Sequence, residues 1–148
     1  MPFLKPAESY SKVELDDLIE RLKHGDENVA YELVVFTMAE SKGIWHGRAR
    51  AKICRYFKNH PPDVTLSASL VESIIKRLQQ GKFSEQFRDQ LRMAIRFAPE
   101  KMKSIALALS TSELDYVRRY AFWVLQSVDA LKNRASRPMG RSGGSASS

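Results

Sequence analysis

A pattern of apolar and small residues occurs twice in the chain, and it decides the fold class. The first copy reads Phe87-Arg88, Leu91, Ala94-Ile95, Ala98, and the second reads Val117-Arg118, Ala121, Val124-Leu125, Val128. Every position of the second copy lies 30 residues after its counterpart, and in both an arginine follows the first apolar residue. A fixed period of this size is typical of stacked helical repeats. The pattern therefore predicts how the chain is built and says little about its chemistry.

The length and composition favour one globular domain. The chain has 148 residues, of which 43% are hydrophobic and 28% are charged, as in ordinary soluble proteins. No apolar run approaches the ~20 residues of a membrane span, and the first residues lack the apolar stretch of a signal peptide. The single cysteine, Cys54, has no disulfide partner within the chain. We expect a cytoplasmic protein without a membrane anchor.

The chain is basic, and its charge is unevenly placed. It has 24 Lys and Arg against 17 Asp and Glu, a net charge of +7. Residues 132–148 contain four cations and no acid, which leaves 20 basic against 17 acidic residues in the first 131. No acid occurs between Glu40 and Asp63, a stretch that includes Lys42, Arg48, Arg50, Lys52, Arg55 and Lys58. Such basic stretches indicate an anionic partner.

Capping residues and apolar spacing predict seven helices and no strand. Ser11 and Glu14 have the spacing of a capping box, Asp26, Ser84 and Ser112 are N-cap candidates, and Gly25, Gly43 and Gly81 are stop candidates. The expected helices span about 12–24, 27 to a stop at Gly43, 44–59, 67–80, 85–98, Pro99 to a break at 110–112, and 113–132. Residues 1–10 are expected to form an irregular arm and 133–148 a disordered basic tail, with the helical domain at 11–132 between them.

Helices 2, 4 and 6 of this series share an apolar spacing. The three sets are Tyr31, Val34, Val35, Met38; Val71, Ile74, Ile75, Leu78; and Met102, Ile105, Ala106, Leu109. Each set is followed, 9 or 10 residues on, by an arginine of the next helix. The sequence therefore predicts three antiparallel helix pairs, with the first helix covering the exposed apolar face at one end. Ile75 and Leu125 are expected to be fully buried.

The second helices of these pairs resemble those of HEAT (armadillo-like) repeats. The clearest match is Asp115-Tyr116-Val117-Arg118 followed by Ala121 and Val124-Leu125, and Ser84 to Ile95 matches more weakly. The resemblance covers about residues 27–130 and implies a right-handed α-α superhelix that holds partners on a curved surface. A weaker similarity is to helical-repeat DNA glycosylases. Their catalytic aromatic and aspartate constellation has no counterpart beside Trp45 or Trp123, so no catalytic residue is carried over.

A basic strip is the candidate binding site. The second helices contribute Arg48, Lys52, Arg55, Arg88, Arg92, Arg96, Arg118 and Arg119. If these helices line one face, their cations form a continuous surface for a phosphate backbone or an acidic peptide. The alternative is structural, because Glu85, Asp89 and Asp115 lie three or four residues from these arginines and can pair with them. Trp45 is a candidate for packing between helices or for an exposed anchor.

Little in the sequence indicates a catalytic site or a metal site. The three histidines, His24, His46 and His60, have no metal-ligand spacing with one another or with Cys54. Cys54 could act as a nucleophile with His46 or His60 as base, but a cysteine on an apolar helix face is typical of a small core residue. The sequence has no phosphate loop, nucleophile motif or cofactor motif.

Two functions remain open from the sequence. The first is a non-enzymatic scaffold module that presents one face of the helical stack to a protein partner. The second is a nucleic-acid-binding protein that uses the basic strip and the basic tail. An enzyme of the glycosylase type is disfavoured on residue grounds.

Overall fold

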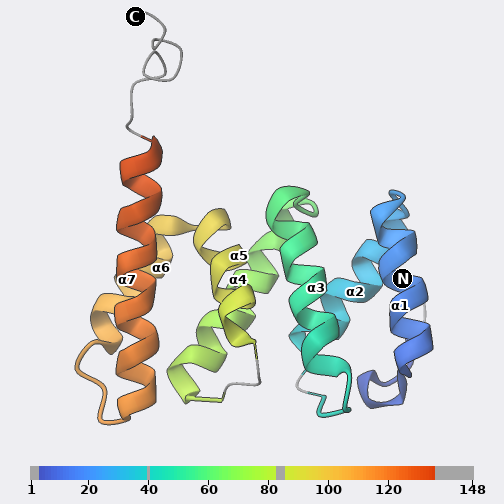
Figure 1. The fold of residues 1–148 in the computed structure, drawn as a ribbon, viewed down its shortest axis with the longest axis horizontal. Helices are drawn as coiled ribbons and strands as arrows, with labels where there is room; N and C mark the ends of the chain where they lie inside the picture. The colour runs from blue at the N-terminus through green and yellow to red at the C-terminus, as the bar shows by residue number, and fades with distance from the viewer. Residues whose placement is uncertain (1–3, 40, 83–85, 136–148) are drawn as a thin grey trace, which may run out of the picture.

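The protein is built from seven α-helices in the part of the chain that the structure describes, with no strand there (Figure 1). The structure is a computed structural model and describes residues 4–39, 41–82 and 86–135. The helices are α1 Lys12–Lys23, α2 Glu27–Met38, α3 His46–Asn59, α4 Val64–Gln80, α5 Phe87–Phe97, α6 Pro99–Leu109 and α7 Asp115–Ala135. The expected all-helical class is confirmed for these residues.

The helices form two layers. In Figure 1, α1, α3, α5 and α7 stand side by side toward the viewer, and α2, α4 and α6 lie behind them. The helices of the front layer run from the lower edge of the view to the upper edge, and those of the rear layer return. Because α3 touches α5, and α5 touches α7, their outward faces form one surface. The first helix, α1, contacts α2 and α3 at one end of the stack.

Local capping sets most of the helix ends. The capping box of Ser11 and Glu14 is formed, and the Asp26 carboxylate accepts hydrogen bonds from the Asn28 and Val29 amides. Gly81 ends α4 with φ of 71°, in the left-handed region where glycine is favoured.

Three expected boundaries are wrong. Helix α4 begins at Val64 and not near 67, since the Asp63 carboxylate caps it by accepting from the Leu66 amide at 2.8 Å. Helix α2 ends at Met38, before the stop expected at Gly43, and α7 continues past 132 to Ala135. The expected cap at Ser84 and the tail from 136 onward lie outside the described residues.

One apolar core runs between the two layers. The expected faces of α3 and α4 are confirmed, because Ile53, Cys54, Phe57, Val71, Ile74, Ile75 and Leu78 are all buried. Full burial of such side chains contributes roughly 1.5–3 kcal/mol each. Leu125 is a correction, since it is only partly buried against the core. On α7 the core is formed instead by Val117, Ala121, Val124 and Val128.

The expected apolar face of α2 is largely wrong. Of that set only Val34 is buried, whereas Tyr31, Val35 and Met38 are half-buried. The residues that α2 buries most deeply are Val29, Leu33, Val34, Phe36 and Thr37. The helix is covered on several sides, by α1, α3 and α4, so its apolar residues surround it and do not form one stripe.

The N-terminal segment is tied to the helices through buried polar groups. It has one short 3-10 turn, Ala7–Ser9, and its Tyr10 side chain is buried. The buried His46 ring donates from Nε2 to the Tyr10 carbonyl at 2.9 Å, and its Nδ1 lies 2.7 Å from the Ser41 hydroxyl. Arg50, also buried, donates to the Ser41 carbonyl at 3.0 Å and lies over the Phe36 ring.

A second buried arginine holds the C-terminal end of α2 against α4 and α5. Arg77 donates to the Thr37 carbonyl at 2.6 Å, to the Gln90 side-chain oxygen and to the Ser73 hydroxyl at 3.2 Å. The Thr37 carbonyl belongs to the last turn of α2, where carbonyls have no partner within their own helix. Arg77 therefore satisfies a helix end and joins three helices.

A candidate basic interface

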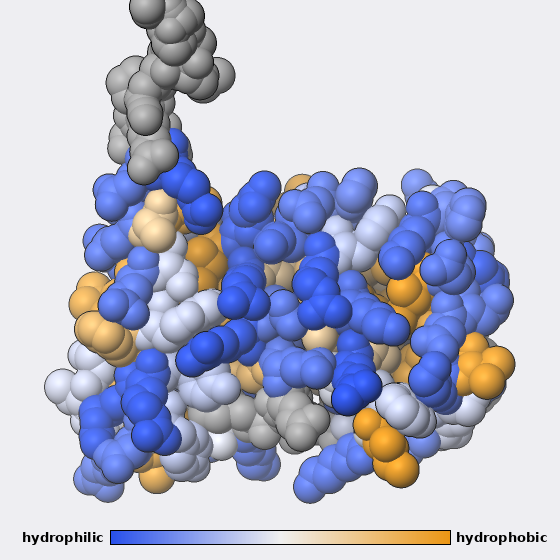
Figure 2. Space-filling model, in the orientation of Figure 1, coloured by the Kyte–Doolittle hydropathy of each residue, from blue (hydrophilic) through white to orange (hydrophobic). Residues whose placement is uncertain are grey.

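The predicted basic strip lies on the outward face of α3, α5 and α7. Figure 2 shows this face, with hydrophilic side chains over α3 and α5 and paler ones over part of α7. Seven of the eight predicted cations are exposed, and Arg118 is half-buried. The set is Arg48, Lys52, Arg55 on α3, Arg88, Arg92, Arg96 on α5, and Arg118, Arg119 on α7. Helix packing thus brings together cations that are far apart in the sequence.

One carboxylate lies within the α3 and α5 part of the strip. Helix α3 has no acid and α5 has only Asp89. The Asp89 carboxylate accepts a hydrogen bond from Arg55 at 2.9 Å and another from Arg92 at 3.2 Å. Its side chain is 13% exposed, whereas the side chains of Arg55 and Arg92 are 54% and 48% exposed. Asp89 therefore links α3 to α5 and fixes two guanidinium groups at the surface.

The Trp123 ring contacts two arginines of the strip. The guanidinium carbons of Arg88 and Arg92 each lie 5.4 Å from the centre of its ring. Such contacts attract the cation to the ring and restrict the arginine to few conformations. Trp123 comes from α7 and both arginines from α5, so this cluster also joins two helices. The sequence alone does not indicate this role of Trp123, because its partners are set by the tertiary structure.

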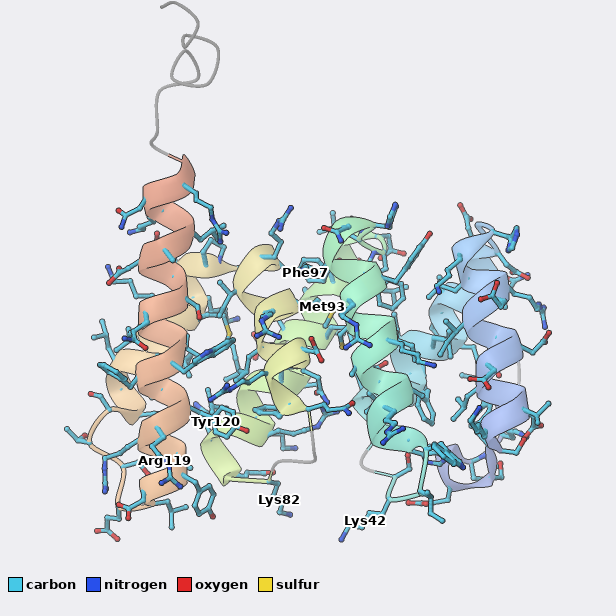
Figure 3. All side chains as sticks on the ribbon, viewed as in Figure 1. Lys42, Lys82, Met93, Phe97, Arg119 and Tyr120 are labelled. Atoms are coloured by element: carbon cyan, nitrogen blue, oxygen red, sulfur yellow. The ribbon has the colours of Figure 1, made fainter. Side chains whose placement is uncertain are left out.

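The two cations that α7 contributes to the strip differ in their contacts with acidic residues of the described part of the chain. Arg118 donates to the Ser112 carbonyl and to the Asp115 carboxylate, as the structural interpretation expected. Arg119, labelled in Figure 3, has no acidic partner among the residues that the structure describes. A hollow of about 440 Å³ lies beside them, lined by Arg88, Asp115, Arg118, Arg119, Phe122 and Trp123. The pairing expected from Glu85 falls outside the described residues.

At the other end, Trp45 lies between two cations. It is 40% exposed, directly before α3, with Lys12 at 5.4 Å and Arg48 at 5.6 Å from its ring. Beyond it the surface is of mixed charge, because α1 carries four acids and three cations. The pKa of one of these, Asp16, is lowered by a hydrogen bond from Lys12 and by the charge of Lys52. The strip therefore ends at α1, and Trp45 marks that border.

A larger hollow lies at the upper ends of α3 and α5. It has a volume of about 660 Å³ and combines apolar residues with the cations Lys58, Arg96 and Lys101 and with the acid Glu72, which pairs with Lys101. Its apolar lining is Pro61, Pro62, Val64, Ala68, Val71, Phe97 and Ala98. Sequence reasoning missed this hollow, since its walls come from four helices and a loop. Arg96 belongs both to the hollow and to the strip.

The nucleophile alternative for Cys54 is not supported by its surroundings. The thiol is fully buried in the core, and burial raises its pKa to about 12, because the thiolate would lose its hydration there. His46 uses both ring nitrogens in other contacts, and the His60 ring is exposed and stacks on Tyr56. The interpretation of Cys54 as a core residue is confirmed.

No protein-family model, curated protein or solved structure matches this chain. Within the described residues, none of the helices is long and apolar enough to cross a membrane.

Proposed function

We propose that this protein is a non-enzymatic binding module and that the α3/α5/α7 face binds the phosphate backbone of a nucleic acid. The observation that carries the proposal is the set of eight cations on the adjoining helices α3, α5 and α7, in which α3 and α5 together hold one acid, Asp89. Rows of Arg and Lys on one face are the electrostatic footprint of phosphate binding. Trp123 and Asp89 hold three of the arginines in place before any ligand arrives, which reduces the ordering cost of binding.

The same proposal includes a HEAT-like, right-handed superhelix. It is supported by the two layers, the return of the chain after every helix, and the position of α1 at one end. In such a stack the second helices of successive pairs form one extended surface, which suits a long polymer.

An acidic protein is the second candidate partner. It is favoured by the hollow at the upper ends of α3 and α5, where apolar residues lie beside Lys58 and Arg96, while Lys101 is paired with Glu72. A protein segment with both acidic and apolar side chains would fit that combination. The strip is the larger feature and has fewer apolar groups, so phosphate is the better match.

The test compares two triple variants by fluorescence anisotropy with a labelled oligonucleotide at ~50 and ~200 mM salt. Replacing Arg88, Arg92 and Arg96 by Gln removes three cations from the front layer. Replacing Lys76, Lys101 and Lys103 by Gln removes the same charge from the rear layer. We expect the first variant to lose most of the affinity and to flatten the salt dependence, at about 0.9 in log–log slope per phosphate on duplex. The second is expected to retain most of the affinity.

Deleting residues 136–148 separates the body from the tail, since it removes Arg137 and Arg141 and leaves every described helix intact. A small loss of affinity is expected. Equal losses in both triple variants, or binding that disappears only with the tail, would show that attraction is nonspecific. No binding at low salt would remove the nucleic-acid proposal and leave the acidic protein.

A further inference from the structure

The hollow at the α7 end contains a large apolar side chain that the fold does not use. Phe122 is 61% exposed, although it lies within one turn of Arg118 and Arg119 and next to Trp123 in the chain. Among the described residues no aromatic ring packs on Phe122, in contrast to Trp123, which lies beside two arginines. A single exposed phenylalanine is ordinary, but here it lines the same hollow as three arginines.

The arginines of the hollow differ in whether they have an acidic partner among the described residues. Arg118 is held by Asp115 and by the Ser112 carbonyl. Arg88 and Arg119 have no acidic partner among the described residues, so their charges remain available to an anion. The hollow therefore combines a flat apolar ring with two cations that have no acidic partner among the described residues. Its volume of about 440 Å³ lies within the range of small-ligand sites, roughly 300–1,000 Å³.

We propose that this hollow binds single-stranded nucleic acid, with an unpaired base stacked on Phe122 and the flanking phosphates bound by Arg88 and Arg119. The inference rests on the proposed function and adds that the strip binds the single-stranded form of a nucleic acid. Bases in a duplex are stacked on one another and offer no free face to a side chain. Unpaired bases do offer one, and proteins that bind single strands combine a basic groove with exposed aromatic rings.

The experiment measures anisotropy of the full chain with a labelled oligo-dT and with a duplex of equal length. In Phe122→Ala, we expect affinity for the single strand to fall about tenfold, because stacking on one base is of that size. Affinity for the duplex is expected to change less than twofold. Phe122→Trp keeps an aromatic ring and is expected to retain the affinity of the original protein. Leu107→Ala is the matched control, since Leu107 is 54% exposed on α6 in the other layer.

The outcomes separate this inference from the proposed function. If the intact protein binds neither ligand, both fail. If it binds both ligands with a salt dependence and Phe122→Ala changes neither, the phosphate interface stands and the base site is overturned. An equal loss for strand and duplex also overturns it. Light scattering completes the test, because a dimer that Phe122→Ala converts to a monomer, with single-strand affinity unchanged, would assign Phe122 to a contact between copies.

Discussion

The buried arginines of this protein hold its helices together, whereas the exposed arginines present the same guanidinium group on the outer face. Arg77 and Arg50 lie inside the molecule and donate to carbonyls at and beyond the end of α2. Arg88 and Arg92 lie on the outer face, against Trp123, with much of their surface in solvent. The first two hold helices together, and the second two are left with donors to offer a ligand. The basic charge of a chain is therefore no measure of its binding surface.

The largest expected effect is on stability, from Arg77→Ala. The change leaves the Thr37 carbonyl and the Gln90 side chain without their donor in a buried site and also opens a cavity. We expect a loss of about 3 kcal/mol in the free energy of unfolding, measured by urea denaturation. A loss below about 1 kcal/mol would contradict the structural role of Arg77 and, with it, the proposed difference between buried and exposed arginines.

The second prediction concerns Cys54, which shares the same interior. Burial raises the pKa of its thiol to about 12, so the reactive thiolate is scarce in the folded protein at pH 8. In the unfolded chain the pKa is near 8.5, and a disulfide reagent should react at least a hundredfold faster there. Because the folded pKa is the higher one, this group stabilises the fold below pH ~8.5 and that contribution is lost as pH rises toward 12.

Labelling of native and urea-unfolded protein over pH 7–10 measures this difference directly. Fast labelling of the folded protein at pH 7 would return Cys54 to the list of candidate nucleophiles.

The smallest expected effect is on stability, from Arg88→Gln on the outer face. Arg88 is exposed and lies against the Trp123 ring, so the free energy of unfolding should change by less than about 0.5 kcal/mol. The same urea titration that is used for Arg77→Ala gives the comparison. A loss as large as that of Arg77→Ala would show that Arg88 stabilises the fold. That is the structural alternative that the spacing of acids to the arginines left open in the sequence.

Helix ends were the most predictable part of the fold, because they are decided locally. The capping box of Ser11 and Glu14, the cap at Asp26 and the left-handed Gly81 are formed as expected. The start of α4 was misplaced because its cap, Asp63, had been overlooked. The apolar faces of α3 and α4 followed from spacing, since each helix buries one side.

Partners across the layers could not be predicted in the same way. The face of α2 was misassigned because this helix is apolar on most sides and its neighbours decide which residues are covered deepest. Arg50 was grouped with the exposed cations of its stretch, although it lies three, four and seven residues before Ile53, Cys54 and Phe57, on their buried face. That spacing was the one available sign that Arg50 is internal.

The candidate site was predictable to the level of its cations and no further. Spacing placed the cations of each helix along its edge, and the helix packing then joined three edges into one strip. The aromatic residues acquired their meaning only from the tertiary structure. Trp123 is a packing residue that also orients two arginines, and Phe122, which lies one position earlier, points to solvent.

The position of Asp89 between Arg55 and Arg92 limits how many phosphates the strip can neutralise. Two guanidinium groups that share one carboxylate carry a net charge of +1, so this cluster compensates one phosphate and not two. Each compensated phosphate sets free the small ions that were condensed on it, and the entropy of those ions drives much of the association. Asp89 thus acts as a counterion that the protein can never release, and it makes binding weaker and less sensitive to salt than the number of arginines implies.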